Sequence, residues 1–271
     1  MKPKVCVLRS AGANCDKETA FAFLKAAASP ELVHINKLIS GQESLDNYQI
    51  LAIPGGFSYG DDLGAGKILA NELRFKLNQG LLKFIEAGKL IIGICNGFQI
   101  LVKSGLLPGN RELKQEASLI INDSGKFEDR WVYLKSPDSR PRSVKCVWTK
   151  GLPKIIELPI AHGEGKFIAK DKAALEKLRQ SNQIVFQYCN QEGRLGGYPV
   201  NPNGAQESIA GICDSTGRIL GLMPHPERHI AITQHPRVQE YLRKKNGSLG
   251  QRAGDGLAIL KNGVDYARKN L

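Results

Sequence analysis

The sequence predicts an α/β fold, with a mostly parallel central sheet, helices on both of its faces and an antiparallel extension. In the first part of the chain, short and continuously apolar runs alternate with helical stretches, which is typical of parallel strands buried on both faces. From Ala117 onward, short β-rich runs crowd together with turn residues between them, which indicates antiparallel or mixed pairing. No linker separates the two regions, so we expect one domain over residues 1–271.

Apolar runs and helical periodicity define the elements expected in the first part. Strands are expected at residues 5–8, 50–53 and 90–94. Helices are expected at residues 19–28, at 68–87 with a break at Gly80, and at 97–103. Each of the last two strands leads into a glycine-containing turn, so these turns lie at the carboxyl edge of the sheet, where open parallel sheets bind ligands.

The second part is expected to be rich in strands and to end in helices. The β-rich runs are at residues 117–121, 131–134, 144–149, 155–161, 184–188, 209–213 and 219–223. A basic helix at 237–245, a glycine-rich loop at 247–256 and an amphipathic helix at 257–269 are expected to follow.

Composition excludes several classes of protein. The 271 residues are 42% hydrophobic, which is too apolar for a disordered chain, and the N-terminal apolar run is too short for a signal peptide. We therefore expect a cytoplasmic protein that does not enter a membrane, with its six cysteines reduced. No C-x-x-C pair indicates a metal site. The formal charge of +12 comes without an RNA-binding aromatic motif or a basic-region helix, so nucleic-acid binding is not expected.

Cys95 has the sequence context of a catalytic nucleophile. It is the centre of Gly93-Ile94-Cys95-Asn96-Gly97, between an expected strand and an expected helix, which is the spacing of a nucleophile elbow. The helix that follows points its positive end at the sulfur, which favours the thiolate, and the Asn96 amide can donate to an oxyanion. The other five cysteines lack this context and are expected only to pack.

His225 and Glu227 are the expected partners of this thiol. His225 follows the run at 219–223 and precedes Pro226, which drives its backbone into an extended conformation. Side chains two residues apart in extended backbone share a face, so Glu227 can fix the imidazole tautomer. His34, His229 and His235 are expected at the surface, and His162, in a glycine-rich turn, has no assigned role on this basis.

A second oxyanion donor is expected from the turn after the strand at 50–53. Pro54-Gly55-Gly56-Phe57 leaves the carboxyl edge of the sheet, and its glycines allow the backbone to approach a substrate closely. The nearby sequence from Gly60 to Lys67 is not a phosphate-binding loop, because its glycine spacing is wrong and Ile68 replaces the hydroxyl residue. We therefore expect no nucleotide or other cofactor on this chain.

Several motifs in order along the chain resemble the glutaminase subunits of phosphoribosylformylglycinamidine synthase, which are class I glutamine amidotransferases. The resemblance covers residues 4 to about 269 and is carried by Asn14-Cys15-Asp16, Gly55-Gly56-Phe57-Ser58-Tyr59-Gly60-Asp61, Cys95-Asn96-Gly97-Phe98-Gln99, His162-Gly163-Glu164-Gly165, Tyr198-Pro199-Val200-Asn201-Pro202-Asn203-Gly204 and Pro224-His225-Pro226-Glu227-Arg228. It implies the flavodoxin-like sheet of class I amidotransferases. It also implies that Cys95, His225 and Glu227 hydrolyse glutamine through a thioester, with the substrate held by Gly55, Gly56, Phe57, Asn96, Gln99 and His162.

The resemblance also implies partners. The ammonia would pass to a synthetase subunit that uses ATP and Mg²⁺ to make an amidine in purine synthesis, and a small accessory subunit would complete the complex. The chain starts with its own Met1 and first strand, which favours a free subunit. Ser10-Ala11-Gly12-Ala13 departs from the family pattern, and the basic stretch and loop at 247–256 look like an insertion. Two alternatives remain, a related cysteine hydrolase of the same fold and a non-catalytic regulatory protein.

Overall fold

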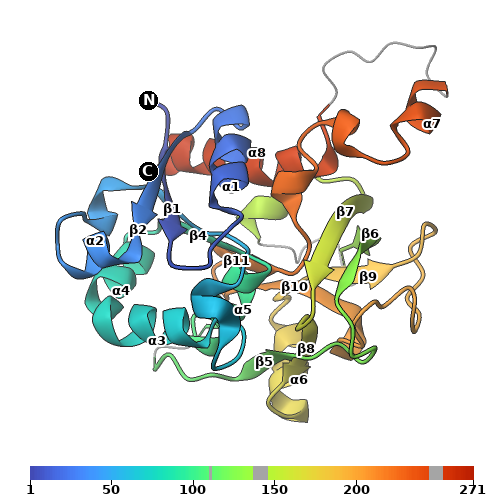
Figure 1. Ribbon diagram of the computed structural model, residues 1–271, viewed down its shortest axis with the longest axis horizontal. Helices are drawn as coiled ribbons and strands as arrows, with labels where there is room; N and C mark the ends of the chain where they lie inside the picture. The colour runs from blue at the N-terminus through green and yellow to red at the C-terminus, as the bar shows by residue number, and fades with distance from the viewer. Residues whose placement is uncertain (110–111, 137–145, 244–252) are drawn as a thin grey trace.

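A large β-sheet forms the centre of the protein (Figure 1). Within the described residues it has nine strands. The computed structural model describes residues 1–109, 112–136, 146–243 and 253–271. The strand order is β2-β1-β3-β4-β11-β10-β9-β6-β7, and its first five strands pair in parallel. This parallel part has the strand order typical of flavodoxin-like sheets, which confirms the predicted fold class.

The parallel part contains the strands with the most apolar sequences. They are β1 (Lys4–Arg9), β2 (Ser29–His34), β3 (Ile50–Ile53), β4 (Leu90–Ile94) and β11 (Ile219–Leu222). Every residue of β3, β4 and β11 is buried, because helices cover both faces of the sheet there. The sequence did not predict β2, an edge strand that contains Pro30 and is mostly half-exposed.

The antiparallel extension is also present. It consists of β10 (Ile209–Cys213), β9 (Ile184–Cys189), β6 (Glu128–Lys135) and β7 (Ile155–His162). One run was assigned to the wrong sheet: β5 (Ala117–Ile120) pairs only with β8 (Lys166–Ala169), in a separate two-stranded sheet. The sequence pattern missed β8 because only three apolar residues, Phe167 to Ala169, lie between Lys166 and Lys170.

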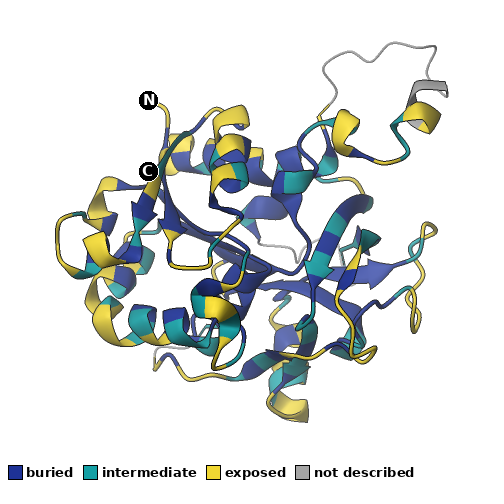
Figure 2. Cartoon of the chain, viewed as in Figure 1, coloured by how far each residue is buried: buried dark blue, intermediate teal, exposed yellow. Residues whose placement is uncertain are grey.

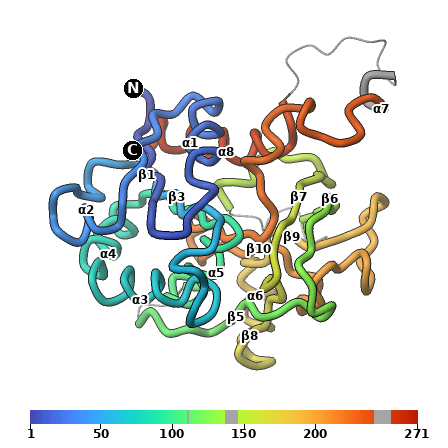
Figure 3. The backbone as a smooth tube through the Cα atoms, viewed as in Figure 1, coloured from blue at the N-terminus to red at the C-terminus, as the bar shows by residue number. Residues whose placement is uncertain are grey.

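Helices cover the two faces of the parallel strands. On one face, α1 (Asp16–Lys25) packs against β1 and β2, and α8 (Asp255–Asn270) packs beside α1 and contacts β3. On the other face, α5 (Asn96–Lys103) contacts β3, β4 and β11, and α3 (Lys67–Lys76) packs on α5. The tube in Figure 3 shows how the C-terminal helix returns to lie next to the first one.

The remaining helices lie further from the centre. They are α2 (Ile35–Ile39), α4 (Asn78–Glu86), α6 (Lys172–Gln180) and α7 (Val238–Arg243). The sequence missed α2 and α6, although Asp171 is a typical N-cap of α6 and accepts a hydrogen bond from the Ala174 amide. Figure 2 shows the contrast between the buried strands and the exposed outer faces of the surrounding helices.

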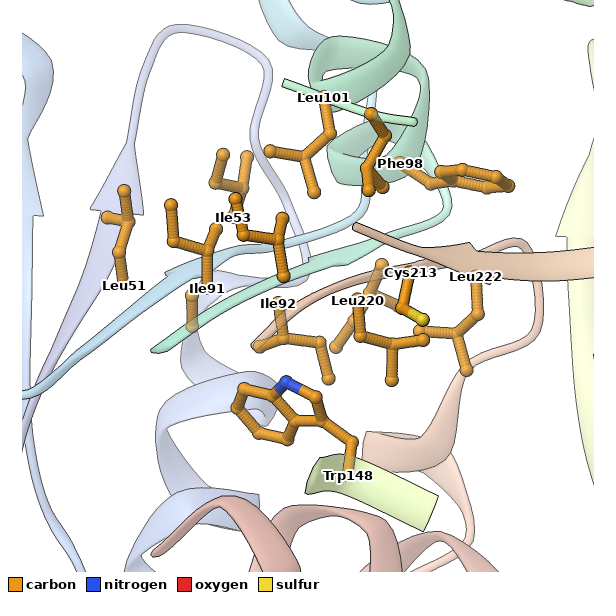
Figure 4. Packing of buried hydrophobic residues seen from close by; sticks show 14 of the residues in the cluster. Leu51, Ile53, Ile91, Ile92, Phe98, Leu101, Trp148, Cys213, Leu220 and Leu222 are labelled. Carbon is orange, nitrogen blue, oxygen red and sulfur yellow. The ribbon is translucent and has the colours of Figure 1, made fainter. Parts of the chain in front are cut away.

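The core is built on both faces of the same strands. Figure 4 shows Phe98 and Leu101 of α5 on one side of the sheet and Trp148 on the other. Trp148 is fully buried, and its indole nitrogen donates to the Arg218 carbonyl. It lies in a 3₁₀ turn, Val147–Thr149, so the strand predicted at 144–149 is wrong for the residues described there, and 144–145 lie outside them.

Other predicted boundaries also differ from the structure. The helix expected at 19–28 is α1, which begins and ends three residues earlier, at Asp16 and Lys25. The break between α3 and α4 is at Leu77 rather than Gly80. Gly80 lies inside α4, where an added Cβ would meet no other atom within 4 Å. The basic helix is described only as Val238–Arg243, and residues 244–245 and 247–252 of the predicted helix and loop lie outside the described residues. The last helix begins at Asp255, inside the predicted loop.

Two of the histidines expected at the surface are buried. His229 is 3% exposed and His235 is 2% exposed, and both rings pack edge-on against Trp131. Glu157 holds both of them: its backbone carbonyl lies 2.7 Å from His229 Nδ1, and its carboxylate lies 3.2 Å from His235 Nε2. This tertiary pairing cannot be read from the polar sequence around the two histidines.

Candidate active site

Cys95 lies on a sharp turn between β4 and α5. Its backbone has φ 51° and ψ −104°, a conformation that residues other than glycine rarely adopt. The glycines on either side are required by space: a Cβ on Gly93 would lie 2.5 Å from the Gly97 carbonyl oxygen, and one on Gly97 would lie 2.0 Å from the Ile53 carbonyl oxygen. The turn therefore has the geometry of a nucleophile elbow, with the sulfur at the N-terminus of α5.

His225 and Glu227 lie at the end of β11, the neighbour of β4 in the sheet. His225 Nδ1 lies 2.6 Å from Glu227 Oε1, and both side chains are buried. The His225 amide donates to the Pro159 carbonyl of β7, which fixes the backbone that carries the ring. Glu227 lies in a short 3₁₀ turn, Pro226–Arg228, rather than in extended chain, and still reaches the imidazole.

The imidazole and the thiol side chain face the same small space. A Cβ on Gly55 would lie 2.8 Å from His225 Cε1, which is too close, and 3.5 Å from Cys95 Cβ, which is an ordinary contact, so a glycine is needed to leave the imidazole in place. Burial alone would lower the pKa of His225, but the Glu227 carboxylate and the Cys95 sulfur raise it well above its ordinary value. The ring therefore holds a proton that it can give to a leaving group.

A cleft of about 230 Å³ opens above these residues. Cys95, His225 and Gly56 are all among the residues that line it. The full lining is Asn14, Cys15, Gly56, Phe57, Asp61, Ala65, Cys95, Gln99, Phe127, Ala161, His162, Gly163, Glu164, His225 and Arg228. The cleft lies at the carboxyl ends of the parallel strands, the place that the sequence predicted.

The two expected oxyanion donors belong to the segments on either edge of the turn region, Asn96 at the start of α5 and Gly56 after β3. The Asn96 amide is the first of α5, and the first amides of a helix have no acceptor within it. Gly56 has φ 136°, and a Cβ there would lie 2.7 Å from the Asn14 amide nitrogen, so its backbone needs a glycine. The Phe57 amide donates to Gly12, so Phe57 contributes to the cleft through its half-exposed ring.

The Asn96 and Gln99 side chains support the cleft from α5. The Asn96 side-chain amide donates to Gln99 Oε1 at 2.9 Å and to Asp61 Oδ1 at 3.2 Å. The Gln99 amide in turn donates to the Glu164 carbonyl. Both side chains are almost fully buried, so they tie the loop at 58–61 and the loop at 163–165 to the helix that carries the nucleophile.

Cys15 and Arg228 are neighbours of the site to which the sequence motifs assigned no catalytic or binding role. Arg228 donates to Cys15 Sγ at 3.2 Å and pairs with Glu18 at 2.8 Å. Burial, and then the nearby Glu227 and Glu18 carboxylates, raise the pKa of the Cys15 thiol, so this cysteine is a poor nucleophile. Its position after β1, at the carboxyl edge of the parallel strands, is the signal that could have placed it here.

The same corner contains one group of side chains that could hold a metal ion. The donor atoms of Cys15, Glu18, His225 and Glu227 lie within 4.8 Å of one another. Arg228 already brings a positive charge to this group through its contacts with Cys15 and Glu18. The arrangement is therefore that of an ion-pair network behind the imidazole.

The fold and the elbow together define a glutamine amidotransferase of class I, and the comparisons with known proteins agree. The family of CobB/CobQ-like glutamine amidotransferase domains matches residues 2–267. The phosphoribosylformylglycinamidine synthase subunit PurQ of Methanococcus maripaludis is 46% identical over 98% of both chains. The subunit PurQ of Dehalococcoides mccartyi is 47% identical over 99% of both.

A solved structure gives the same result. One chain of PurLQS from Thermotoga maritima is 31% identical, with a TM-score of 0.70 over 98% of this chain and 99% of that one. The chain belongs to the PurQ family, the glutamine amidotransferase subunits of phosphoribosylformylglycinamidine synthase. Among the described residues, no helix combines the length and the apolar character needed to cross a membrane.

Proposed function

We propose that this chain hydrolyses glutamine to glutamate and ammonia through Cys95, His225 and Glu227, and that the ammonia is used in purine biosynthesis. The observation that carries the proposal is the buried His225–Glu227 pair facing a cysteine on a positive-φ elbow within one cleft. Membership of the PurQ family favours this activity over a peptide-directed hydrolase or a non-catalytic regulator.

In the acylation step, the Cys95 thiolate attacks the side-chain amide carbon of glutamine. The Asn96 amide and the Gly56 backbone stabilise the negative oxygen that forms, and His225 gives its Nε2 proton to the departing nitrogen. Ammonia leaves, and a γ-glutamyl thioester remains on Cys95. Glu227 keeps the proton on Nδ1, so that Nε2 is the atom that exchanges protons with the substrate.

In the deacylation step, a water molecule replaces ammonia. His225, now neutral, takes a proton from that water, and the hydroxide attacks the thioester carbon. The carbon–sulfur bond breaks, glutamate leaves and the thiolate–imidazolium pair is restored. Gln99, His162 and the Gly55-Gly56-Phe57 turn position the substrate.

The partners are part of the same proposal. A synthetase subunit that binds ATP and Mg²⁺ receives the ammonia, and a small accessory subunit completes the complex. PurLQS from Thermotoga maritima is the assembly that suggests both subunits. The absence of a cofactor on this chain, its cytoplasmic location and its lack of nucleic-acid binding stay predictions.

Labelling with an electrophilic glutamine analogue tests the proposed nucleophile. A diazoketone analogue should modify Cys95, and peptide mass mapping should find no label in Cys95→Ser. Cys15→Ser is the matched control, because it removes the other thiol of the cleft and should keep the label. Glutaminase activity should rise when the synthetase subunit is added. Labelling on Cys15 instead, or glutamine turnover in Cys95→Ser, would contradict the proposal.

A further inference from the structure

His162 lies next to the nucleophile at the end of β7. Its side chain lines the cleft together with Cys95 and His225 and is 3% exposed. The carbonyl of the preceding residue, Ala161, accepts a hydrogen bond from the Cys95 thiol at 3.6 Å. The imidazole is therefore close to the atoms that react. The reaction steps above let it position the substrate but do not say which substrate atom its ring nitrogens contact.

Asn122 fixes the tautomer of this imidazole. The Asn122 side-chain nitrogen donates to the carbonyls of Lys126 and His162, at 2.9 Å and 2.8 Å. Its Oδ1 accepts from the Gly165 amide at 2.9 Å, so this atom is certainly the oxygen. His162 Nδ1 lies 3.2 Å from the same oxygen and must carry a proton to donate to it.

The other ring nitrogen of His162 is an acceptor. Burial, together with the nearby charges of His225 and Arg130, lowers the pKa of His162 to about 3, so the ring is neutral at physiological pH. A neutral ring with its proton on Nδ1 carries a lone pair on Nε2. Nε2 is buried, and none of the residues that the structure describes donates a hydrogen bond to it.

Gly165 holds the ring in this orientation. A Cβ on Gly165 would lie 2.2 Å from His162 Cε1 and 2.4 Å from Nδ1, so the backbone of residue 165 packs directly on the imidazole. The Gly165 carbonyl is in turn bound by the Asn203 side chain at 2.8 Å. Buried polar atoms normally have a hydrogen-bond partner, so the unpaired Nε2 of this fixed ring indicates a ligand that donates a hydrogen bond to it.

We propose that Nε2 of His162 accepts a hydrogen bond from the carboxamide nitrogen of glutamine, and so makes His162 a specificity-determining residue for an amide. This inference rests on the proposed function, because it requires Cys95 to attack that amide. Glutamine offers N–H donors at this position, whereas the product glutamate offers only acceptor oxygens. The lone pair of His162 would repel them, which favours release of the product.

Two substrates that share the acyl group separate this role from a structural one. Glutamine and the γ-methyl ester of glutamate give the same thioester, but the ester has no N–H donor on its leaving group. His162→Asn keeps a donor for Asn122 and removes the Nε2 acceptor, and His162→Gln can place an amide oxygen near the Nε2 position. All variants are assayed in the complex with the synthetase subunit.

In His162→Asn, kcat/KM for glutamine should fall about 10- to 100-fold, as for loss of a buried hydrogen bond, while that for the ester should change less than about threefold. In the same variant, glutamate should inhibit more strongly, so its inhibition constant should fall relative to the KM for glutamine. His162→Gln should recover part of the lost kcat/KM for glutamine. An equal loss on both substrates, or no loss on glutamine, would overturn the inference. Diazoketone labelling of Cys95 separates the two proposals, because wild type that is neither labelled nor active would refute the proposed function itself.

Discussion

The imidazole of His225 and the carboxylate of Glu227 form a buried pair, with 2.6 Å between Nδ1 and Oε1 and at most 2% of either side chain exposed. The two residues are only two positions apart in the chain, and the His225 amide donates to the Pro159 carbonyl of β7. Because the pair is buried, its electrostatic effect on the ring is not screened by solvent.

Glu227→Gln should lower kcat about 10²- to 10⁴-fold, because the amide cannot hold the imidazolium or fix its tautomer. The carboxylate raises the pKa of His225, so its removal lowers that pKa. The protonated ring is then lost at lower pH, and the alkaline limb of the kcat profile should move in the acid direction. Glutaminase rates measured from pH 6 to 10 check this. An unchanged alkaline limb would mean that a group other than His225 determines the pH at which kcat falls.

Gly55→Ala should reduce kcat/KM by about 10²-fold, the effect of displacing a catalytic group by about 1 Å. The added Cβ would meet His225 Cε1 at 2.8 Å and Cys15 Sγ at 3.2 Å, so the ring must move. Gly197→Ala is the control, since a Cβ there meets nothing within 4 Å. Steady-state kinetics of the two variants should differ clearly, and equal activities would show that the imidazole tolerates displacement.

Gly97→Ala should lower the free energy of unfolding by about 1–3 kcal/mol, the usual result of overpacking. The new Cβ would lie 2.0 Å from the Ile53 carbonyl oxygen, which is backbone and cannot rotate away. Gly80→Ala, at an open position inside α4, should instead stabilise the protein by about 0.5–1 kcal/mol. Urea unfolding measures both changes, and a stabilised Gly97→Ala would refute close helix–strand packing at the elbow.

His162 should make the protein less stable in acid. Its pKa in the folded protein is about 3, below the ordinary histidine value of 6.5. The unfolded chain therefore takes up the proton at a higher pH than the folded protein, and stability falls as the pH drops from about 6.5 toward 3. The contribution is at most about 1.4 kcal/mol per pH unit. His162→Gln has no imidazole at this position and does not lose this stability in acid. The wild type should therefore lose its stability advantage over the variant, and the difference in unfolding free energy should shrink, between pH 7 and pH 5. A constant difference would mean that His162 titrates normally.

The sequence predicted the central part of the fold well, because its signals there are local. The strands at 50–53 and 90–94 are continuous apolar runs, and the structure has them at the same residues. β2 and β8 were missed because their pairing comes from neighbours far away in the chain, Lys4–Arg9 and Ala117–Ile120. That residues 1–271 form one domain stays a prediction.

The same division holds for the candidate site. The glycine spacing around Cys95 and the two-residue separation of His225 and Glu227 are local, so the sequence could indicate both. Cys15 and Arg228 are 213 positions apart, and only the fold brings them into contact behind the imidazole. The roles of the individual site residues stay proposals that the experiments above test.

The sequence by itself determined the kind of fold and indicated the candidate catalytic residues, because apolar periodicity, turn glycines and a proline act on their nearest neighbours. Only the tertiary structure decided how the electrostatics of the site are arranged. It buried His162 against Gly165, set its tautomer through Asn122 and placed it beside Cys95. Burial and contacts between distant segments fix those properties, and no short stretch of sequence contains them.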